Sequence, residues 1–203
     1  MIERLTEAMQ IAQYLKSPVL FGTDTFDDGY FPTRGIKAGA SYSWTFAGFP
    51  YRFDNFHTIA ADVKGVVSGG DVFAFLPSAN ARFLLGNEIP VAYFNAIGGS
   101  LAGRYVDQQL PFIGVTNLRA MENIMAMARM DFRFKFLRNH YLTGIVNYVR
   151  DGDTFKEFVG SPGYFGAGLE YAYDTIFGPF KFNVHWSNLS KTVGVYLSAG
   201  YNF

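Results

Sequence analysis

The chain of 203 residues has 17 basic and 17 acidic side chains, so its net charge gives no electrostatic reason to expect a nucleic-acid partner. It has no cysteine, which excludes a disulfide scaffold, a thiolate zinc site and a cysteine nucleophile. The longest uncharged stretch, residues 89–103, contains proline and glycine and is shorter than the roughly 18 residues of a membrane helix. What is unusual is the combination of 18% aromatic residues with 22 glycines, which is rare in a water-soluble core of this size.

Residues 1–16 form the first predicted element. Apolar residues recur there at helical spacing, at Ile2, Leu5, Met9, Ala12 and Leu15. This spacing predicts a short amphipathic helix or a linker. The segment lacks the apolar core of a secretory signal, and its polar face is not basic, so a packed or linking helix is favoured over an anchor at a membrane surface.

From Gly35 onward the apolar residues recur with a period of two, which is typical of strands with one apolar face. The clearest example is 124–136, where apolar residues alternate with Arg129, Asp131, Arg133 and Lys135. We expect eight complete strands within residues 17–203. They are residues 36–46, 59–67, 79–85, 124–136, 142–148, 165–173, 180–186 and 193–203.

The connections between these strands alternate between longer links and tight turns. One end of the strand array therefore carries short turns and the other carries longer loops. One face of these strands consists of glycine, serine, threonine and asparagine, and the other of phenylalanine, tyrosine and valine. This pattern predicts an all-β, antiparallel transmembrane β-barrel of an outer membrane. Its apolar face would contact outer-membrane lipids. A soluble sandwich or lipocalin-like barrel also alternates, but sandwich strands are usually shorter and their apolar face points inward.

Four motifs resemble those of the BamA/TamA superfamily of outer-membrane barrels, over about residues 19–203. They are the Gly29–Gly35 turn with Pro32 and Gly35, the pair Gly98 and Gly99 followed by Gly103-Arg104-Tyr105, the turn Gly178-Pro179, and the terminal strand with Tyr201 and Phe203. The resemblance implies a long loop, 86–123, that folds into the lumen and is hinged at Gly98 and Gly99. It also implies that the C-terminal strand is the signal read by the barrel assembly machinery.

Two further segments, 105–112 and 168–171, resemble the C-terminal barrel of Bacteroidetes-type patatin-like phospholipases. Such proteins consist of a signal peptide, a patatin lipase domain, a small periplasmic module and a 16-stranded barrel whose ninth strand follows the Pro-Thr-x-Gly turn. The resemblance implies that this chain is the second half of such a barrel, with residues 14–23 as the end of the eighth strand. The partners would then be the N-terminal half or an upstream patatin-like lipase domain, which the barrel anchors or translocates.

In relatives the loop tip reads Arg-Gly-aromatic and its arginine meets acidic or aromatic groups on the lumen wall, whereas residues 103–105 here read Gly-Arg-Tyr. By the alternation, Asp131 and Glu170 face the lumen, so we expect Arg104 to pair with one of them in a charge-assisted contact. The alternative is that Arg104 faces solvent and Asp131 pairs with a basic strand neighbour, namely Arg129, Arg133 or Lys135.

The sequence predicts no catalysis, cofactor or metal in this chain. The nearest match to a Gly-x-Ser-x-Gly elbow, residues 98–102, lacks the last glycine, and His57, His140 and His185 are scattered over different strands. Three alternatives remain open: a BamA/TamA-type barrel for protein insertion or secretion, a self-contained eight-stranded barrel, and an outer-membrane phospholipase that uses a serine with His140. An eight-stranded lumen is filled by side chains, so it would leave residues 86–123 outside.

Overall fold

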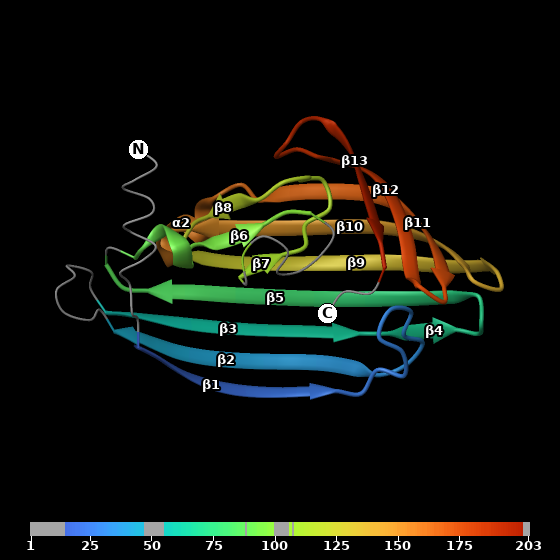
Figure 1. Ribbon diagram of the computed structural model, residues 1–203. Coiled ribbons are helices and arrows are strands. Elements are labelled where there is room, and N and C mark those ends of the chain that lie inside the picture. Colours follow the sequence, from blue (N-terminus) through green and yellow to red (C-terminus); the bar gives the residue numbers. More distant parts are fainter. Residues whose placement is uncertain (1–14, 47–54, 88, 100–105, 107, 201–203) are drawn as a thin grey trace.

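The computed structural model describes residues 15–46, 55–87, 89–99, 106 and 108–200. One large, curved antiparallel sheet makes up most of this part of the chain (Figure 1). Within the described ranges, no helix has the length and apolar character needed to cross a membrane.

The strands follow one another in the sheet in chain order. Their bounds are β1 (Leu15–Asp24), β2 (Ile36–Phe46), β3 (Phe56–Gly65), β4 (Val67–Gly69), β5 (Phe73–Leu85), β9 (Ile124–Leu137), β10 (His140–Gly152), β11 (Tyr164–Thr175), β12 (Gly178–Ser187) and β13 (Val193–Ala199). The order is β1-β2-β3-β5-β9-β10-β11-β12-β13, and the short β4 pairs with β5. Over the described residues the sheet is not closed, because β1 and β13 each have one neighbouring strand.

The expectation of eight complete strands is corrected by β1, a ninth long strand, which lies where the family resemblance placed the end of a preceding strand, residues 14–23. This strand pairs with β2 along its whole length, from Leu15 opposite Phe46 to Asp24 opposite Lys37. Leu15 and Lys16, which the helical spacing assigned to an N-terminal helix or linker, therefore belong to the sheet, because pairing satisfies backbone groups along the edge of β2. Residues 1–14 lie outside the described part. Nine long strands with two open edges are not a closed eight-stranded barrel.

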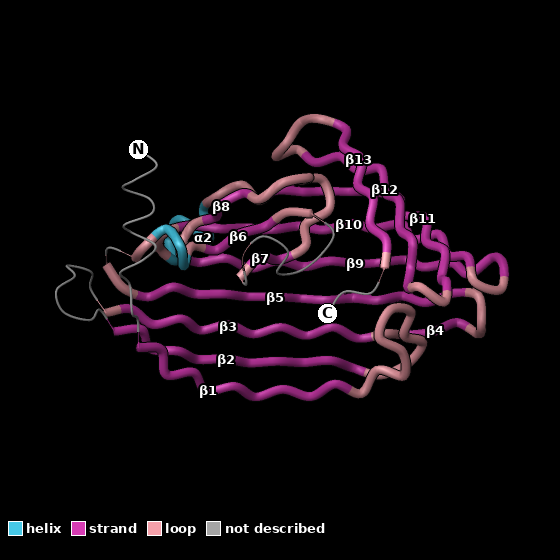
Figure 2. The backbone as a smooth tube through the Cα atoms, viewed as in Figure 1, coloured by secondary structure: helices cyan, strands magenta, loops and turns pink. Residues whose placement is uncertain are grey.

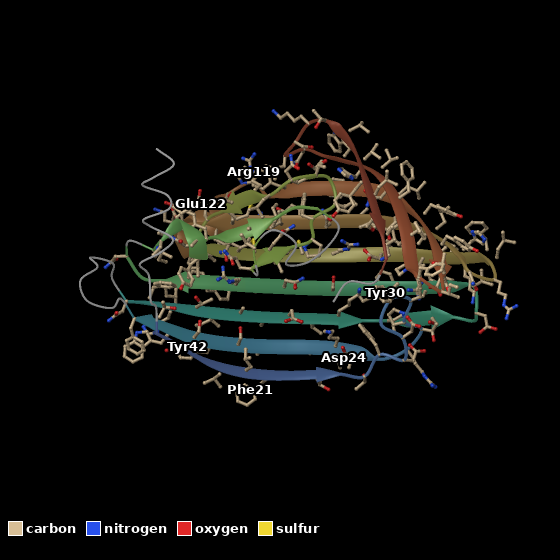
Figure 3. All side chains as sticks on the ribbon, viewed as in Figure 1. Phe21, Asp24, Tyr30, Tyr42, Arg119 and Glu122 are labelled. Carbon is tan, nitrogen blue, oxygen red and sulfur yellow. The ribbon has the colours of Figure 1, made fainter. Side chains whose placement is uncertain are left out.

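The two faces of the sheet differ in residue type. The side formed by the alternating apolar residues, here called the outer face, exposes large rings such as Phe21 and Tyr42 (Figure 3). The opposite side, here called the inner face, buries polar side chains, namely Thr143, Asn147, Asn183, His185 and Ser187. A water-soluble sandwich buries its apolar side instead. The arrangement is typical of strands surrounded by lipid.

The link between β5 and β9, residues 86–123, folds over the inner face (Figure 2). It contains the 3₁₀ helix η1 (Val91–Tyr93) and a small sheet of β6 (Asn95–Ile97), β7 (Gln109–Leu110) and β8 (Arg119–Met121). Apolar residues of this link pack against β9 and β10 in one buried cluster. The cluster consists of Ile97, Phe112, Val115, Met121, Met125, Met127 and Val149. The inner face is therefore apolar where it meets this part of the link.

A second short helix, α2 (Phe155–Gly160), lies in the link between β10 and β11. Its N-cap is Thr154, whose hydroxyl accepts a hydrogen bond from the Glu157 amide at 3.2 Å, while the Glu157 carboxylate accepts one from the Asp153 amide at 3.2 Å. This reciprocal arrangement resembles a capping box. The ring of Phe155 stacks at 6.0 Å from Phe83 of β5.

Candidate functional site

The two ends of the sheet carry different connections. Links 86–123 and 153–163 are at one end, here called the loop end, whereas the two-residue turns 138–139 and 176–177 are at the other, here called the turn end (Figure 2). This asymmetry is the one expected from the spacing of the strands. An exception is the link 25–35, which contains the Gly-Tyr-Phe-Pro-Thr-x-Gly motif and lies at the turn end.

Side chains of the inner face hold the backbone of the link 86–123. The Asn147 amide group contacts Ile113 twice, accepting from its N–H at 2.8 Å and donating to its carbonyl oxygen at 3.3 Å. The Ser187 hydroxyl donates to the Gly114 carbonyl oxygen at 2.8 Å. Asn147 and Ser187 are both buried, so water does not replace these bonds at low cost.

Glycines of β11 provide the space in which the link approaches the sheet. A Cβ atom at Gly166 would lie 2.0 Å from the Ile113 carbonyl oxygen, and one at Gly168 would lie 2.7 Å from Ile113 Cγ1. No side chain fits at these distances without movement of the link or of the strand. The sequence indicated that many glycines belong to the inner wall, but it did not show which segment approaches them.

The two ends of the link are also fixed. The Asn95 amide donates to the carbonyl oxygens of Glu122 at 2.7 Å and Asn123 at 3.0 Å. The Arg82 guanidinium donates to Asn95 Oδ1 at 2.6 Å and to the Tyr93 carbonyl oxygen at 3.1 Å. One asparagine thus joins the beginning of the link to its end and to β5.

The pair Gly98 and Gly99, expected as a hinge, lies where the link crosses itself. Their φ angles are 141° and 65°, in the region that favours glycine. A Cβ atom at Gly98 would lie 1.9 Å from the Asn117 carbonyl oxygen. The Gly98 amide donates to the Leu110 carbonyl oxygen at 3.0 Å and the Gly99 amide to that of Val115 at 2.6 Å. Gly98 has no room for a side chain, Gly99 has a left-handed conformation that favours glycine, and both are held in place by hydrogen bonds.

Among the predicted lumen contacts, Asp131 pairs with its strand neighbour Arg129. Two hydrogen bonds join the groups, from Arg129 Nε to Oδ1 at 2.7 Å and from Nη2 to Oδ2 at 3.1 Å. Glu170 lies 3.8 Å from Lys181 Nζ on β12. Arg104 lies outside the described residues, so its contact with Asp131 or Glu170 stays a prediction.

The motif link 25–35 is organised by two aspartates. Asp28 accepts hydrogen bonds from the amides of Tyr30 and Phe31, both at 2.7 Å, and Asp27 accepts one from the Thr33 amide at 2.8 Å. Hydrogen bonds from the Thr33 hydroxyl and amide lower the pKa of Asp27 from 3.8 to about 2. The carboxylate therefore holds the link in this shape at neutral pH.

The same link places Phe31 on the inner face at the turn end. The ring of Phe31 stacks on that of Tyr141, with centroids 4.0 Å apart and planes 7° apart. Arg133 donates to the Pro32 carbonyl oxygen, and its guanidinium lies 5.8 Å from the Phe31 ring, within the range of a cation–π contact. The sequence singled out Pro32 but not the Phe31–Tyr141 stack, because these two residues are distant in the chain.

Two glycines of the turns that resemble the superfamily motifs, Gly35 and Gly178, have positive φ angles that favour glycine. Gly35 has a φ of 114°, and a Cβ atom there would lie 2.4 Å from the Thr25 carbonyl oxygen. Gly178 has a φ of 97° and precedes the buried Pro179, whose carbonyl oxygen accepts from the Gly200 amide at 3.2 Å. Tyr201 and Phe203, the expected assembly signal, lie outside the described residues.

The three histidines lie in separate surroundings. His57 contacts the Tyr42 hydroxyl at 2.8 Å and His140 the Tyr171 hydroxyl at 2.7 Å, both on the outer face. His185 is on the inner face, 3.2 Å from the Thr116 hydroxyl. The part of the chain that the structure describes contains no group of three acidic or histidine side chains that could hold a metal ion.

Comparison with known proteins identifies the family of the chain. No match was found among the curated proteins. The family model of the OMP85 superfamily matches residues 4–203, which is nearly the whole chain. Members of this family are outer-membrane β-barrel proteins, and their barrels are typically not catalytic. The chain therefore belongs to the OMP85 superfamily, and its large antiparallel sheet is an outer-membrane barrel region.

Proposed function

We propose that this barrel region anchors or translocates an upstream patatin-like lipase domain at the outer membrane and performs no catalysis itself. The observation that supports an anchor is the link 86–123, which lies over part of the inner face and is held there by Asn147 and Ser187. A link held on the inner face suits a barrel that holds a domain at the membrane better than one that conducts solutes.

The proposed lipase partner is supported by the two segments that resemble patatin-like barrels, 105–112 and 168–171. On the inner face, Ile113, which directly follows the first segment, packs on Gly168 of the second. A likeness in two separate segments is stronger support than a likeness limited to one.

The experiment is to isolate the native protein from outer membranes with an antibody to the sheet region. Its intact mass and phospholipase activity are then measured before and after proteolysis that leaves only the membrane-embedded barrel. We expect phospholipase activity in the intact protein and none in the barrel fragment. An intact protein without hydrolase activity, whose mass leaves room only for periplasmic repeats, would refute the proposal.

The second candidate is a barrel that inserts or secretes other polypeptides. The observation that favours it is the pair of open edges at β1 and β13 in the described sheet, since an unpaired edge is a template for another strand. The assay is depletion of the protein in cells. Loss of other outer-membrane proteins from the membrane would support this candidate, whereas loss of lipase from the cell surface alone would support the anchor.

A further inference from the structure

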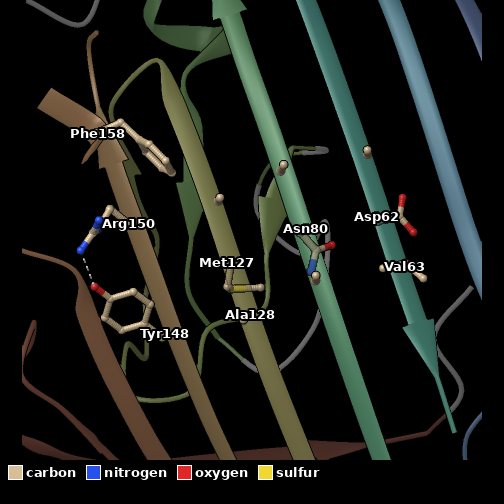
Figure 4. Close-up of a pocket in the computed structure, with 12 residues that line it drawn as sticks. Asp62, Val63, Asn80, Met127, Ala128, Tyr148, Arg150 and Phe158 are labelled. Atoms are coloured by element: carbon tan, nitrogen blue, oxygen red, sulfur yellow. Dashed lines mark hydrogen bonds between the residues drawn. The ribbon is translucent and has the colours of Figure 1, made fainter. Parts of the chain in front are cut away.

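The outer face is recessed where small residues of three neighbouring strands meet. Ala61 of β3 pairs with Ala81 of β5, which pairs with Ala126 of β9, and the next row consists of Val63, Ala79 and Ala128. These rows line a shallow groove of about 700 Å³ (Figure 4). Toward the turn end β5 and β9 carry large rings instead, such as Phe75 opposite Phe132. The groove is therefore a local hollow in a face of bulky side chains.

One side of this groove is formed by Tyr148 and Arg150 of β10 and by Phe158 of α2 (Figure 4). The Arg150 guanidinium donates to the Tyr148 hydroxyl and to the Val159 carbonyl oxygen, both at 3.2 Å. Its Nε atom is buried without a hydrogen-bond partner. No ion pair among the described residues includes Arg150. The groove thus has a cationic edge, Arg150, whose hydrogen-bond partners are all neutral.

The position of Arg150 along the strand places this edge near a membrane surface. Arg150 is two residues from the end of β10 at the loop end, and α2 follows it with Phe155 and Val159 exposed. In outer-membrane barrels the longer loops face outward from the cell and aromatic girdles mark the interfaces. Arg150 would therefore lie at the level of lipid headgroups in the outer leaflet, beside the first alanine row, because it pairs with Ala126. The second row, level with Tyr148, would lie one step closer to the hydrocarbon.

We propose that the groove binds a phosphate-bearing lipid of the outer leaflet, with one acyl chain on the alanine rows and the phosphate on Arg150 and Tyr148. A guanidinium that has only neutral partners is complementary to a phosphate, which it contacts through two parallel N–H donors. The apolar recess supplies the volume for a chain that the surrounding rings would not admit. The proposal uses only the lipid-facing side of an outer-membrane barrel and does not require the lipase.

The test is native mass spectrometry of the full-length protein in detergent with added phosphatidylglycerol. We expect one tightly bound lipid, with affinity lowered about tenfold or more by Arg150→Gln and lost in Ala126→Leu, which fills the groove. Lys156→Gln is the matched control, because it removes a positive charge from the exposed side of α2 at the same end of the sheet. This control should change affinity by less than about twofold. Millimolar inorganic phosphate should not displace the lipid.

Equal losses in Arg150→Gln and Lys156→Gln would overturn the proposal, because they would indicate general charge attraction. Displacement by free phosphate would overturn it as well. An Ala126→Leu variant that changes from dimer to monomer without losing lipid would show instead that the groove is an interface between copies of this chain. Unchanged thermal unfolding of each variant on semi-native gels establishes that the barrel is folded. These outcomes are independent of whether a lipase lies upstream.

Discussion

Replacing Gly166 with alanine would place a methyl group where the link 86–123 crosses β11. The new Cβ atom would be 2.0 Å from the Ile113 carbonyl oxygen and 2.6 Å from Asn147 Nδ2, whereas ordinary contact begins at 3.4 Å. The link must therefore move by about 1.4 Å, the difference between the ordinary contact distance and the 2.0 Å approach. A movement of this size breaks the hydrogen bonds between Asn147 and Ile113.

The cost of that movement follows from the groups left without partners. A buried donor or acceptor that loses its partner costs about 1–3 kcal/mol, so the loss of two bonds destabilises the docked link by about 3 kcal/mol. Every 1.4 kcal/mol is a tenfold change, which makes undocking of the link roughly 100-fold more frequent. The sheet itself keeps its strand pairing, because the methyl group points to the inner face.

The assay is hydrogen exchange of residues 109–116 in detergent, together with conductance of the full-length protein in a planar bilayer. Gly166→Ala should lower the protection of the Ile113 amide by about two orders of magnitude and increase the conductance. The control is Gly144→Ala on β10, where a Cβ atom meets no atom within 4 Å. Unchanged protection and conductance in Gly166→Ala would refute the docking of the link on the inner face.

Three further predictions concern the motif link and the charged groups. Because the folded pKa of Asp27 is about 2 instead of 3.8, its contribution to the shape of link 25–35 is complete above about pH 4 and is lost as the pH falls through 2. Pepsin cleavage of this link, measured by mass spectrometry, should be slower in the native protein than in Asp27→Asn at about pH 4, and the two should be cleaved at the same rate once the pH is below about 2. Phe31→Ala removes a buried ring stacked on Tyr141 and should lower stability by about 3–5 kcal/mol, read as a lower melting temperature on semi-native gels, and Phe31→Leu should lose less. If Arg104 meets Asp131, exchanging the two charges should restore a stability that each single reversal lowers, and a double variant no better than the singles would exclude the pair.

Local sequence patterns were sufficient to predict eight of the nine long strands, the two faces and membership of a superfamily of outer-membrane barrels. A period of two is a property of each strand by itself, so the alternation of Arg129, Asp131 and Arg133 with large rings defines one apolar face without knowledge of the neighbours. Likewise Gly35 and Gly178 indicate turns because only glycine adopts their φ angles at no steric cost. The length of the link 86–123 also follows directly from the spacing of the strands.

Strand pairing decided what the sequence left open at the N-terminal side and on the inner face. Leu15 has helical spacing with earlier apolar residues, yet Leu15 and Lys16 form the start of β1 because β2 offers an edge of matching length. The contacts of Ile113 with Asn147 and Gly166 join segments that are far apart in the chain. No periodicity within either segment contains that information.

The groove on the outer face illustrates the same limit. Ala61, Ala81 and Ala126 are unremarkable within their own strands, and they form a recess only because the register places them side by side. Arg150 then stands beside them through the pairing of β9 with β10. Sequence by itself determined that these strands have one face for lipid and one for the interior. Only the tertiary structure decided which residues become neighbours across strands, because register depends on pairing between segments and not on the order within one.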